Sequence, residues 1–191
     1  MTRTLFYVPR MYTEVEFRTL TGCLPKDLKQ ETREFWKYVE EKLLMFAGRI
    51  QRIYRDGNFK SGEDGLAHLA SIDWDNYSLA KKLVEKGATF EATEDRIQVA
   101  ESESWLVMLN SPDSNPITFE LYQQTIKERN NYVACKISET LKTDEIGVLF
   151  FDPSRHIKAS DDIKVITVYR FNPLDYLKSW QVKQRLNAKN G

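Results

Sequence analysis

The sequence predicts one α/β domain over residues 1–191, built as a mainly parallel sheet of about five strands with helices on both faces. Strand-like and helix-like segments alternate along the chain, which is the arrangement that builds parallel sheets. The length of 191 residues suits one domain. The run IGVLFF at 146–151 is continuously apolar, which is typical of a strand covered on both faces.

The first strand is expected at residues 5–8, where the β-rich run TLFYVP ends at Pro9. A helix follows, for which Asp27 and Gln30 have the spacing of a capping box. Apolar residues then recur at helical spacing, at Phe35, Trp36, Val39, Leu43 and Phe46. Gly48 is the expected end of this helix.

The middle of the chain continues the alternation. A strand is expected at 50–54, because IQRIY stops at an Asp-Gly turn. Residues 61–76 are expected to form a loop with one short helix. NYSLAKKLVEKG, at 76–87, has helical periodicity and closes on a glycine, and ATFEAT, at 88–93, is a short strand.

The last part begins with a helix expected at 94–110, with Ile97, Ala100 and Met108 inward. Ser114 and Pro116 are expected to start a long helix that runs to about residue 142.

After the apolar strand at 146–151, IKVITVY at 163–169 reads as the last strand. Asn172 and Pro173 open a final helix, and the tail is expected to fray from about residue 186.

Composition restricts the partners and the compartment. Lys plus Arg equals Asp plus Glu at 28 each, so the chain has no basic field of the kind that a general nucleic-acid binder needs. The cysteines Cys23 and Cys135 are too few for a cysteine-rich zinc site. No run reaches the roughly 20 apolar residues of a membrane helix, and the N-terminus lacks a convincing signal peptide. We therefore expect a cytoplasmic protein that binds neither nucleic acid nor membrane.

The familiar catalytic and cofactor motifs are missing from the sequence. It contains no G-x-S-x-G, no phosphate-binding G-x-x-x-x-G-K-[ST], no G-x-G-x-x-G and no H-E-x-x-H. What remains is a set of carboxylates, arginines and a histidine, suited to acid–base chemistry or to holding an anionic or metal-bound ligand. The cofactor is unknown, and a divalent metal ion held by carboxylates is left open.

Polar residues follow each expected strand, at the end of the sheet where α/β proteins bind ligands. Tyr12 and Glu14 follow the first strand, Asp56 the second, Glu94 the third, and Asp152, Arg155 and His156 the fourth. These loops are expected to converge on one small-molecule site. Plainer roles stay open for each, since a loop histidine is often a surface or capping residue and Asp56 suits the turn itself.

Segments from most of the chain resemble an uncharacterised prokaryotic α/β family. They are LFYVPRMYTEVEFRTL, IYRDG with NYSLAKKLVEKGATFEATE, and ERNNYVACKISETLKTDEIGVLFFDPSRHI. That family carries Pro-x-x-His-Thr-Glu, Tyr-Gln-Asp-Gly, Gly-Thr-Glu and Gly-Ala-x-His stretches in the same order. It is distantly similar to TraB/TIKI-like and erythromycin-esterase-like proteins. The resemblance implies a hydrolase-like site with His156, Glu94 and Arg129 as catalytic residues and Asn130 beside Arg129.

The chain departs from the family pattern at several positions. Tyr12 stands where the family has its first histidine, Arg55 where it has glutamine, Ala92 where it has glycine, and Pro153–Ser154 where it has Gly-Ala. Losing a histidine removes a metal ligand or a base, and a tyrosine with a pKa of about 10 is a poor replacement.

Two hypotheses follow from the sequence. The first is a divergent hydrolase-like domain in which Tyr12, Glu14, Asp56, Asn130 and Arg155 bind the ligand. The second is a non-catalytic ligand-binding or protein-assembly module, such as a homodimer. Its interface would use aromatic residues, namely Trp74, Trp105, Tyr176 and Trp180. These aromatics also suit a plainer role in packing the helices against the sheet.

Overall fold

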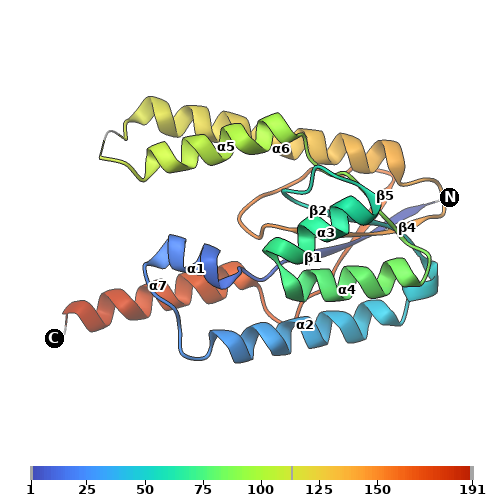
Figure 1. Ribbon diagram of the computed structural model, residues 1–191, viewed down its shortest axis with the longest axis horizontal. Helices are drawn as coiled ribbons and strands as arrows, with labels where there is room; N and C mark the ends of the chain where they lie inside the picture. Colours follow the sequence, from blue (N-terminus) through green and yellow to red (C-terminus); the bar gives the residue numbers. More distant parts are fainter. Residues whose placement is uncertain (1, 113, 190–191) are drawn as a thin grey trace.

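The structure, a computed structural model, describes residues 2–112 and 114–189 and is an α/β sandwich of helices around a parallel sheet (Figure 1). In this described part, five strands lie in the order β3-β2-β4-β1-β5, and every neighbouring pair is parallel. The strands are β1 (Arg3–Pro9), β2 (Ile50–Arg55), β3 (Thr89–Phe90), β4 (Ile146–Phe151) and β5 (Ile163–Thr167). The predicted α/β fold is confirmed.

Helices cover both faces of the sheet (Figure 1). One face carries α6 (Pro116–Thr140), against which α5 (Arg96–Leu109) packs. The other face carries α2 (Leu28–Leu44), α4 (Trp74–Glu85) and α7 (Pro173–Lys189). The shorter helices α1 (Glu14–Thr21) and α3 (Gly62–Ile72) lie toward one end of the sheet, and a 3₁₀ turn, η1 (Ala47–Arg49), precedes β2.

The central strand β4 shows why the apolar run is continuous. Phe150 belongs to a large core cluster and stacks near Trp36 of α2, with ring centroids 5.9 Å apart. Its neighbour Phe151 points to the other face, in a smaller cluster with Val133 of α6. Each fully buried side chain of this size contributes about 1.5–3 kcal/mol through removal from water. Both faces therefore require apolar residues at every position of the strand.

The order of the strands places a reversal of chain direction at the centre of the sheet. The chain runs from β1 outward to β2 and β3, and then returns so that β4 lies between β2 and β1. In open parallel sheets, ligands bind beyond the carboxyl ends of the strands at such a reversal. The ends of β1, β4 and β2 are thus the place to look for a site.

Helix α1 was not predicted, although both of its ends carry clear local signals. Thr13 is its N-cap and forms a capping box with Glu16, and Gly22 ends the helix with a φ of 77°. The capping box predicted at Asp27 is wrong, because Asp27 has helical backbone angles and makes no capping hydrogen bond. Its carboxylate instead accepts a hydrogen bond from the hydroxyl of Tyr176 at 2.9 Å.

The inward face predicted for α5 is also wrong. Ile97 is 77% exposed and Met108 is 48% exposed, and Ala100 is exposed as well. The buried positions are Val99 and Ser102. Apolar residues occur all around this helix, so periodicity alone does not single out the face that packs on α6.

Two helix ends differ from the sequence expectation. Helix α2 ends at Leu44, and Gly48 lies in the following 3₁₀ turn. Helix α7 continues to Lys189, past the fraying expected from residue 186, and residues 190–191 lie outside the described part. Among the helices that the structure describes, none is both long and apolar enough to cross a bilayer.

Candidate ligand-binding site

The carboxyl ends of β1, β2 and β4 open into a cavity of about 990 Å³, which we call the arginine cavity. Its walls come from the loops after these strands and from α1, α3, α5 and α6. The volume is in the range of cavities that hold small molecules and cofactors.

Buried arginines define the cavity. Among the described residues, Arg10, Arg55, Arg129 and Arg155 line it and are each at most 8% exposed. Arginine is rarely buried unless its charge is paired. The partners of these guanidinium groups therefore decide what the site can do.

Glu94 holds two of the arginines in place. Its Oε1 accepts hydrogen bonds from the backbone N–H of Gly57 at 2.9 Å and from Nη1 of Arg155 at 2.6 Å. Its Oε2 accepts from Nε of Arg129 at 2.5 Å. Since the side chain is 1% exposed and both oxygens are engaged, Glu94 orients the guanidinium groups and is not placed as a free base.

Further contacts fix the same two guanidinium planes. Nε of Arg155 donates to Oδ1 of Asn130 at 2.8 Å, and its guanidinium lies 4.7 Å from the ring centre of Phe151. Nη1 of Arg129 donates to Oγ of Ser102 at 2.5 Å. Each arginine is thus held by an anion and by at least one neutral group.

Arg10 forms a second ion-paired group at the end of β1. Nε of Arg10 donates to Oδ1 of Asp56 at 2.8 Å, and its Nη2 donates to Oε1 of Glu16 at 2.7 Å. Burial opposes the ionisation of Asp56, but the charges of Arg10 and Arg55 outweigh it and hold the pKa of Asp56 well below its usual value. Asp56 is consequently an ionised, fully paired carboxylate.

Arg55 and Asp73 form a looser pair. Nη2 of Arg55 lies 3.6 Å from Oδ2 of Asp73, which is longer than a hydrogen bond. Nη1 of Arg55 donates to the backbone oxygen of Asp56. Burial raises the pKa of Asp73 despite the opposing charge of Arg55. Burial thus favours the neutral form of Asp73 more than it would for an exposed aspartate.

Several guanidinium nitrogens lack a partner. Nε of Arg55 and Nη2 of Arg155 are buried and make no hydrogen bond to any described residue. Nη2 of Arg129 also makes none within the described ranges, but this atom is accessible to solvent, while Nε and Nη1 of the same side chain donate to Glu94 and Ser102. Buried polar groups are nearly always hydrogen-bonded in folded proteins, so such donors call for an explanation.

Asp152, at the end of the central strand, is a half-buried carboxylate that lines the arginine cavity. Its Oδ1 accepts from the backbone N–H of Ser154 at 2.8 Å and from the Ser154 hydroxyl at 2.7 Å. Burial, followed by the charge of Asp152, raises the pKa of Tyr7 to about 12 and also raises the pKa of Tyr122. The negative charge of Asp152 therefore disfavours the ionisation of Tyr7 and Tyr122.

The structure brings together some of the predicted site residues. Glu94, Arg129, Asn130 and Arg155 are in direct contact. Asp56 lines the same cavity through its pair with Arg10. Sequence reasoning missed Asp73, Ser102 and Tyr122, which occupy helical or interhelical positions and carry no strand-end signal.

The expected meeting of His156 with Glu94 and Arg129 does not occur. His156 is exposed and lines a different cavity of about 370 Å³, together with Tyr7 and Val165. The loop after β4 turns Arg155 inward, so that the next side chain points away.

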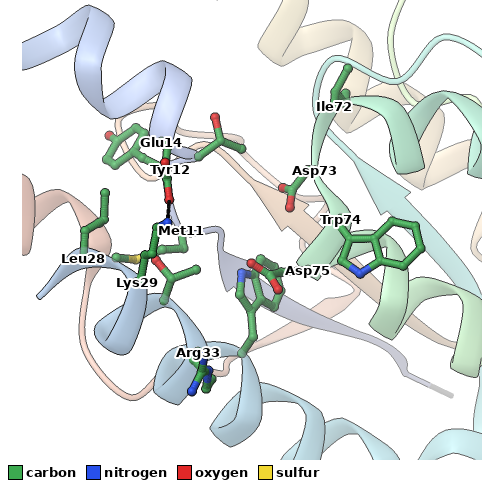
Figure 2. Close-up of a pocket in the computed structure, with 13 residues that line it drawn as sticks. Met11, Tyr12, Glu14, Leu28, Lys29, Arg33, Ile72, Asp73, Trp74 and Asp75 are labelled. Carbon is green, nitrogen blue, oxygen red and sulfur yellow. Dashed lines mark ion pairs between the residues drawn. The ribbon is translucent and has the colours of Figure 1, made fainter. Parts of the chain in front are cut away.

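Tyr12 and Glu14 also lie outside the arginine cavity. Tyr12 is 5% exposed and part of the large core cluster, and Glu14 is exposed and pairs with Lys29 at 3.6 Å. Both line a third cavity of about 360 Å³, in which Figure 2 shows the Glu14–Lys29 pair.

The predicted interface aromatics are dispersed. Tyr176 and Trp180 are half-buried and pack on the large core cluster, as in the plainer interpretation. Trp105 is half-buried on α5, whereas Trp74 is 67% exposed.

The described residues contain no group of three or more His, Cys, Asp or Glu side chains placed to hold a metal ion. The buried carboxylates near the arginine cavity each face an arginine instead. This donor set fits an anion better than a divalent cation.

The chain matches no protein-family model, no curated protein and no solved structure. The family resemblance therefore stays a prediction from its motifs, and the argument for function depends on the geometry of the site.

Proposed function

We propose that this protein binds a small oxyanion-bearing molecule, with a carboxylate or phosphate group, in the arginine cavity. The observation that carries the proposal is the set of guanidinium nitrogens without a hydrogen-bond partner among the described residues, namely the buried Nε of Arg55 and Nη2 of Arg155 and the solvent-accessible Nη2 of Arg129. Guanidinium groups bind carboxylates and phosphates through pairs of parallel hydrogen bonds. A ligand oxyanion would satisfy donors that the protein leaves free.

The burial of the arginines supports the same conclusion. The four buried guanidinium groups of the described cavity face four carboxyl groups, on Glu16, Asp56, Asp73 and Glu94. Each of these carboxyl groups already pairs with a guanidinium group, and Nε of Arg55 and Nη2 of Arg155 still have no hydrogen-bond partner among the described residues. An anionic ligand would meet guanidinium groups that are already out of water, so their desolvation adds little to the cost of binding.

The position of the arginine cavity in the fold also supports the proposal. The cavity lies at the carboxyl ends of β1, β4 and β2, where the strand order reverses. Glu94 and Asn130 hold Arg129 and Arg155 in fixed orientations, which reduces the entropy that binding costs.

The test is isothermal titration of the purified protein with inorganic phosphate and, separately, with citrate. Arg55→Gln is compared with Arg52→Gln, which removes an arginine from the same strand that pairs with Glu91 and Glu145 away from the cavity. We expect saturable binding of at least one anion and an affinity at least tenfold weaker in Arg55→Gln alone. Equal affinities in both variants, or no saturable binding by the parent protein, would contradict the proposal.

A second candidate is hydrolysis within the same cavity, and the position of Asp152 favours it. Its Oδ1 is oriented by Ser154 at the end of the central strand, and its Oδ2 makes no hydrogen bond to the described residues. A carboxylate in this setting is suited to take a proton from an attacking water. In this version Asp152, and not His156, is the general base.

A panel of ester, amide and phosphate substrates tests this candidate. Asp152→Asn is expected to lower any turnover by about 10²-fold or more, the usual effect of a general base. Asp161→Asn, at an exposed loop position, and His156→Ala are expected to leave it unchanged. A parent protein inactive on every substrate, or an Asp152→Asn protein of full activity, would rule it out.

A further inference from the structure

The arginine cavity is larger than an oxyanion alone needs, and one of its sides is apolar. Its volume is about 990 Å³, and the guanidinium groups lie at the ends of the strands. The side formed by α5 and α6 carries Leu106, Tyr122 and Ile126 instead. Ligand cavities commonly combine a mainly apolar lining with a few polar groups that fix the orientation of the ligand. The cavity therefore has room for more than the charged group of a ligand.

This apolar side is separate from the hydrophobic core. Leu106, Tyr122 and Ile126 are half-buried, and none of them belongs to the two core clusters of the described residues. The core residues of α6 lie further along the helix, at Val133 and Ile137. In Figure 1 the α5–α6 hairpin extends beyond the carboxyl ends of the strands, where it has no sheet to cover. The apolar side chains on that part of the hairpin thus line the cavity and do not pack on the sheet.

Aromatic groups also line the cavity from the loop after β2 and from α3. The ring centres of Phe59 and His68 are 5.1 Å apart. Burial, followed by the charge of Arg55, lowers the pKa of His68 and so favours a neutral imidazole. Together with Tyr122, these rings offer faces and edges that pair with another aromatic ring.

Arg129 connects the charged part of the cavity to the apolar side. Its Nη2 is accessible to solvent and makes no hydrogen bond to the described residues, while its Nε is held by Glu94. Tyr122, Ile126 and Arg129 follow one another on α6 at spacings of four and three residues. Residues at these spacings are neighbours on one face of a helix. An oxyanion bound by Arg129 would therefore have the rest of its molecule beside Ile126 and Tyr122.

We propose that the ligand of the arginine cavity is an aromatic oxyanion, in which a carboxylate or phosphate group is joined to an aromatic ring. The oxyanion accepts a hydrogen bond from Nη2 of Arg129, and the ring lies against Leu106, Tyr122 and Ile126. This inference rests on the proposed anion-binding function and adds the class of ligand. An anion without an apolar group would leave the apolar side in contact with water, which is unfavourable in proportion to its area.

The test compares anions that differ only in the group joined to the oxyanion. One series is acetate, cyclohexanecarboxylate and benzoate, and the other is methyl, cyclohexyl and phenyl phosphate. Calorimetry at pH 8, where the members of a series carry the same charge, measures each affinity for the parent protein, and inorganic phosphate is the reference. We expect the phenyl compound of at least one series to bind about tenfold or more tightly than the methyl compound, because it removes a ring from water.

The outcomes separate this inference from the proposed function. Binding of inorganic phosphate or acetate without any gain from the ring would overturn the aromatic ligand and leave the anion site standing. A cyclohexyl compound that binds as tightly as its phenyl counterpart would overturn the aromatic assignment in the same way. Absence of saturable binding by every compound would overturn both.

Matched substitutions locate the ring. Tyr122→Ala removes an aromatic side chain from the cavity, whereas Tyr132→Ala removes a half-buried tyrosine of the same helix that does not line it. We expect Tyr122→Ala to weaken binding of the phenyl compound about fivefold and to leave the methyl compound unchanged, because only an aromatic contact is lost. Tyr132→Ala is expected to change neither. Equal losses for the two compounds, or equal effects of the two substitutions, would refute the assignment.

A second pair of variants makes the same comparison on α5, so that the test does not depend on one variant folding. Leu106 lines the cavity, and Leu109 is half-buried on the same helix and does not. We expect Leu106→Ala to weaken binding of the phenyl compound and Leu109→Ala to leave it unchanged. The same affinity in both variants would contradict the position given to the ring.

Discussion

Replacing Glu94 with glutamine perturbs the site at its most connected side chain. Glu94 accepts hydrogen bonds from Arg129, Arg155 and the backbone of Gly57, and its side chain is 1% exposed. The glutamine has the same shape, but its amide N–H groups face an arginine and its charge is gone. Removing one partner of a buried ion pair typically costs about 3–5 kcal/mol, because the remaining charge is left without compensation.

Urea unfolding, followed by circular dichroism, measures this cost directly. In thermal unfolding of a chain of this length, about 1 kcal/mol lowers the melting temperature by about 2–4 °C, so we also expect the melting temperature of Glu94→Gln to be about 6–20 °C lower. Glu91→Gln is the control, three residues earlier, where the carboxylate pairs with Arg52 at 2.6 Å in a more exposed position. Its cost is expected to be about 1 kcal/mol or less. Equal destabilisation by the two substitutions would refute the role given to Glu94.

Other substitutions test the packing, the capping and the charge of the same region. Gly147→Ala is expected to cost about 1–3 kcal/mol in urea unfolding, because the new methyl group would lie 3.1–3.2 Å from three side chains, while Gly48→Ala has open space and little effect. Thr13→Ala is expected to cost about 1 kcal/mol through loss of the α1 capping box, and Ser61→Ala, an N-cap without a side-chain hydrogen bond, less in the same assay. Asp56 is ionised in the folded state with a depressed pKa, so its contribution to stability is present above the unfolded pKa of about 4 and is lost as pH falls below it. Unfolding free energies measured from pH 6 to pH 2 should therefore fall more steeply for the parent protein than for Asp56→Asn, and parallel curves would contradict this.

Much of the fold could be predicted because the local sequence patterns match the burial of the same residues in the folded structure. The run at 146–151 is apolar throughout because β4 is covered on both faces. Helix α6 begins at Pro116, as the proline indicated. Helix α1 was missed because its eight residues bury a single side chain, Phe17, and so lack a periodic apolar signal.

The candidate site could be predicted in part, through the rule that strand ends carry ligands. That rule located Glu94, Arg155 and Asp56, which follow strands and line or support the arginine cavity. It misplaced His156, because the direction of a side chain within a loop depends on backbone angles that spacing does not encode. Asp73 escaped notice because it lies between two helices, at the N-cap of α4, and does not follow a strand.

The most direct test of the central claim is a crystal of the parent protein grown or soaked with selenate, an oxyanion whose selenium gives an anomalous signal. The account predicts an anomalous peak in the arginine cavity, within hydrogen-bond distance of Arg55 or Arg129. Selenate peaks confined to the protein surface, with only water beside those guanidinium groups, would contradict it.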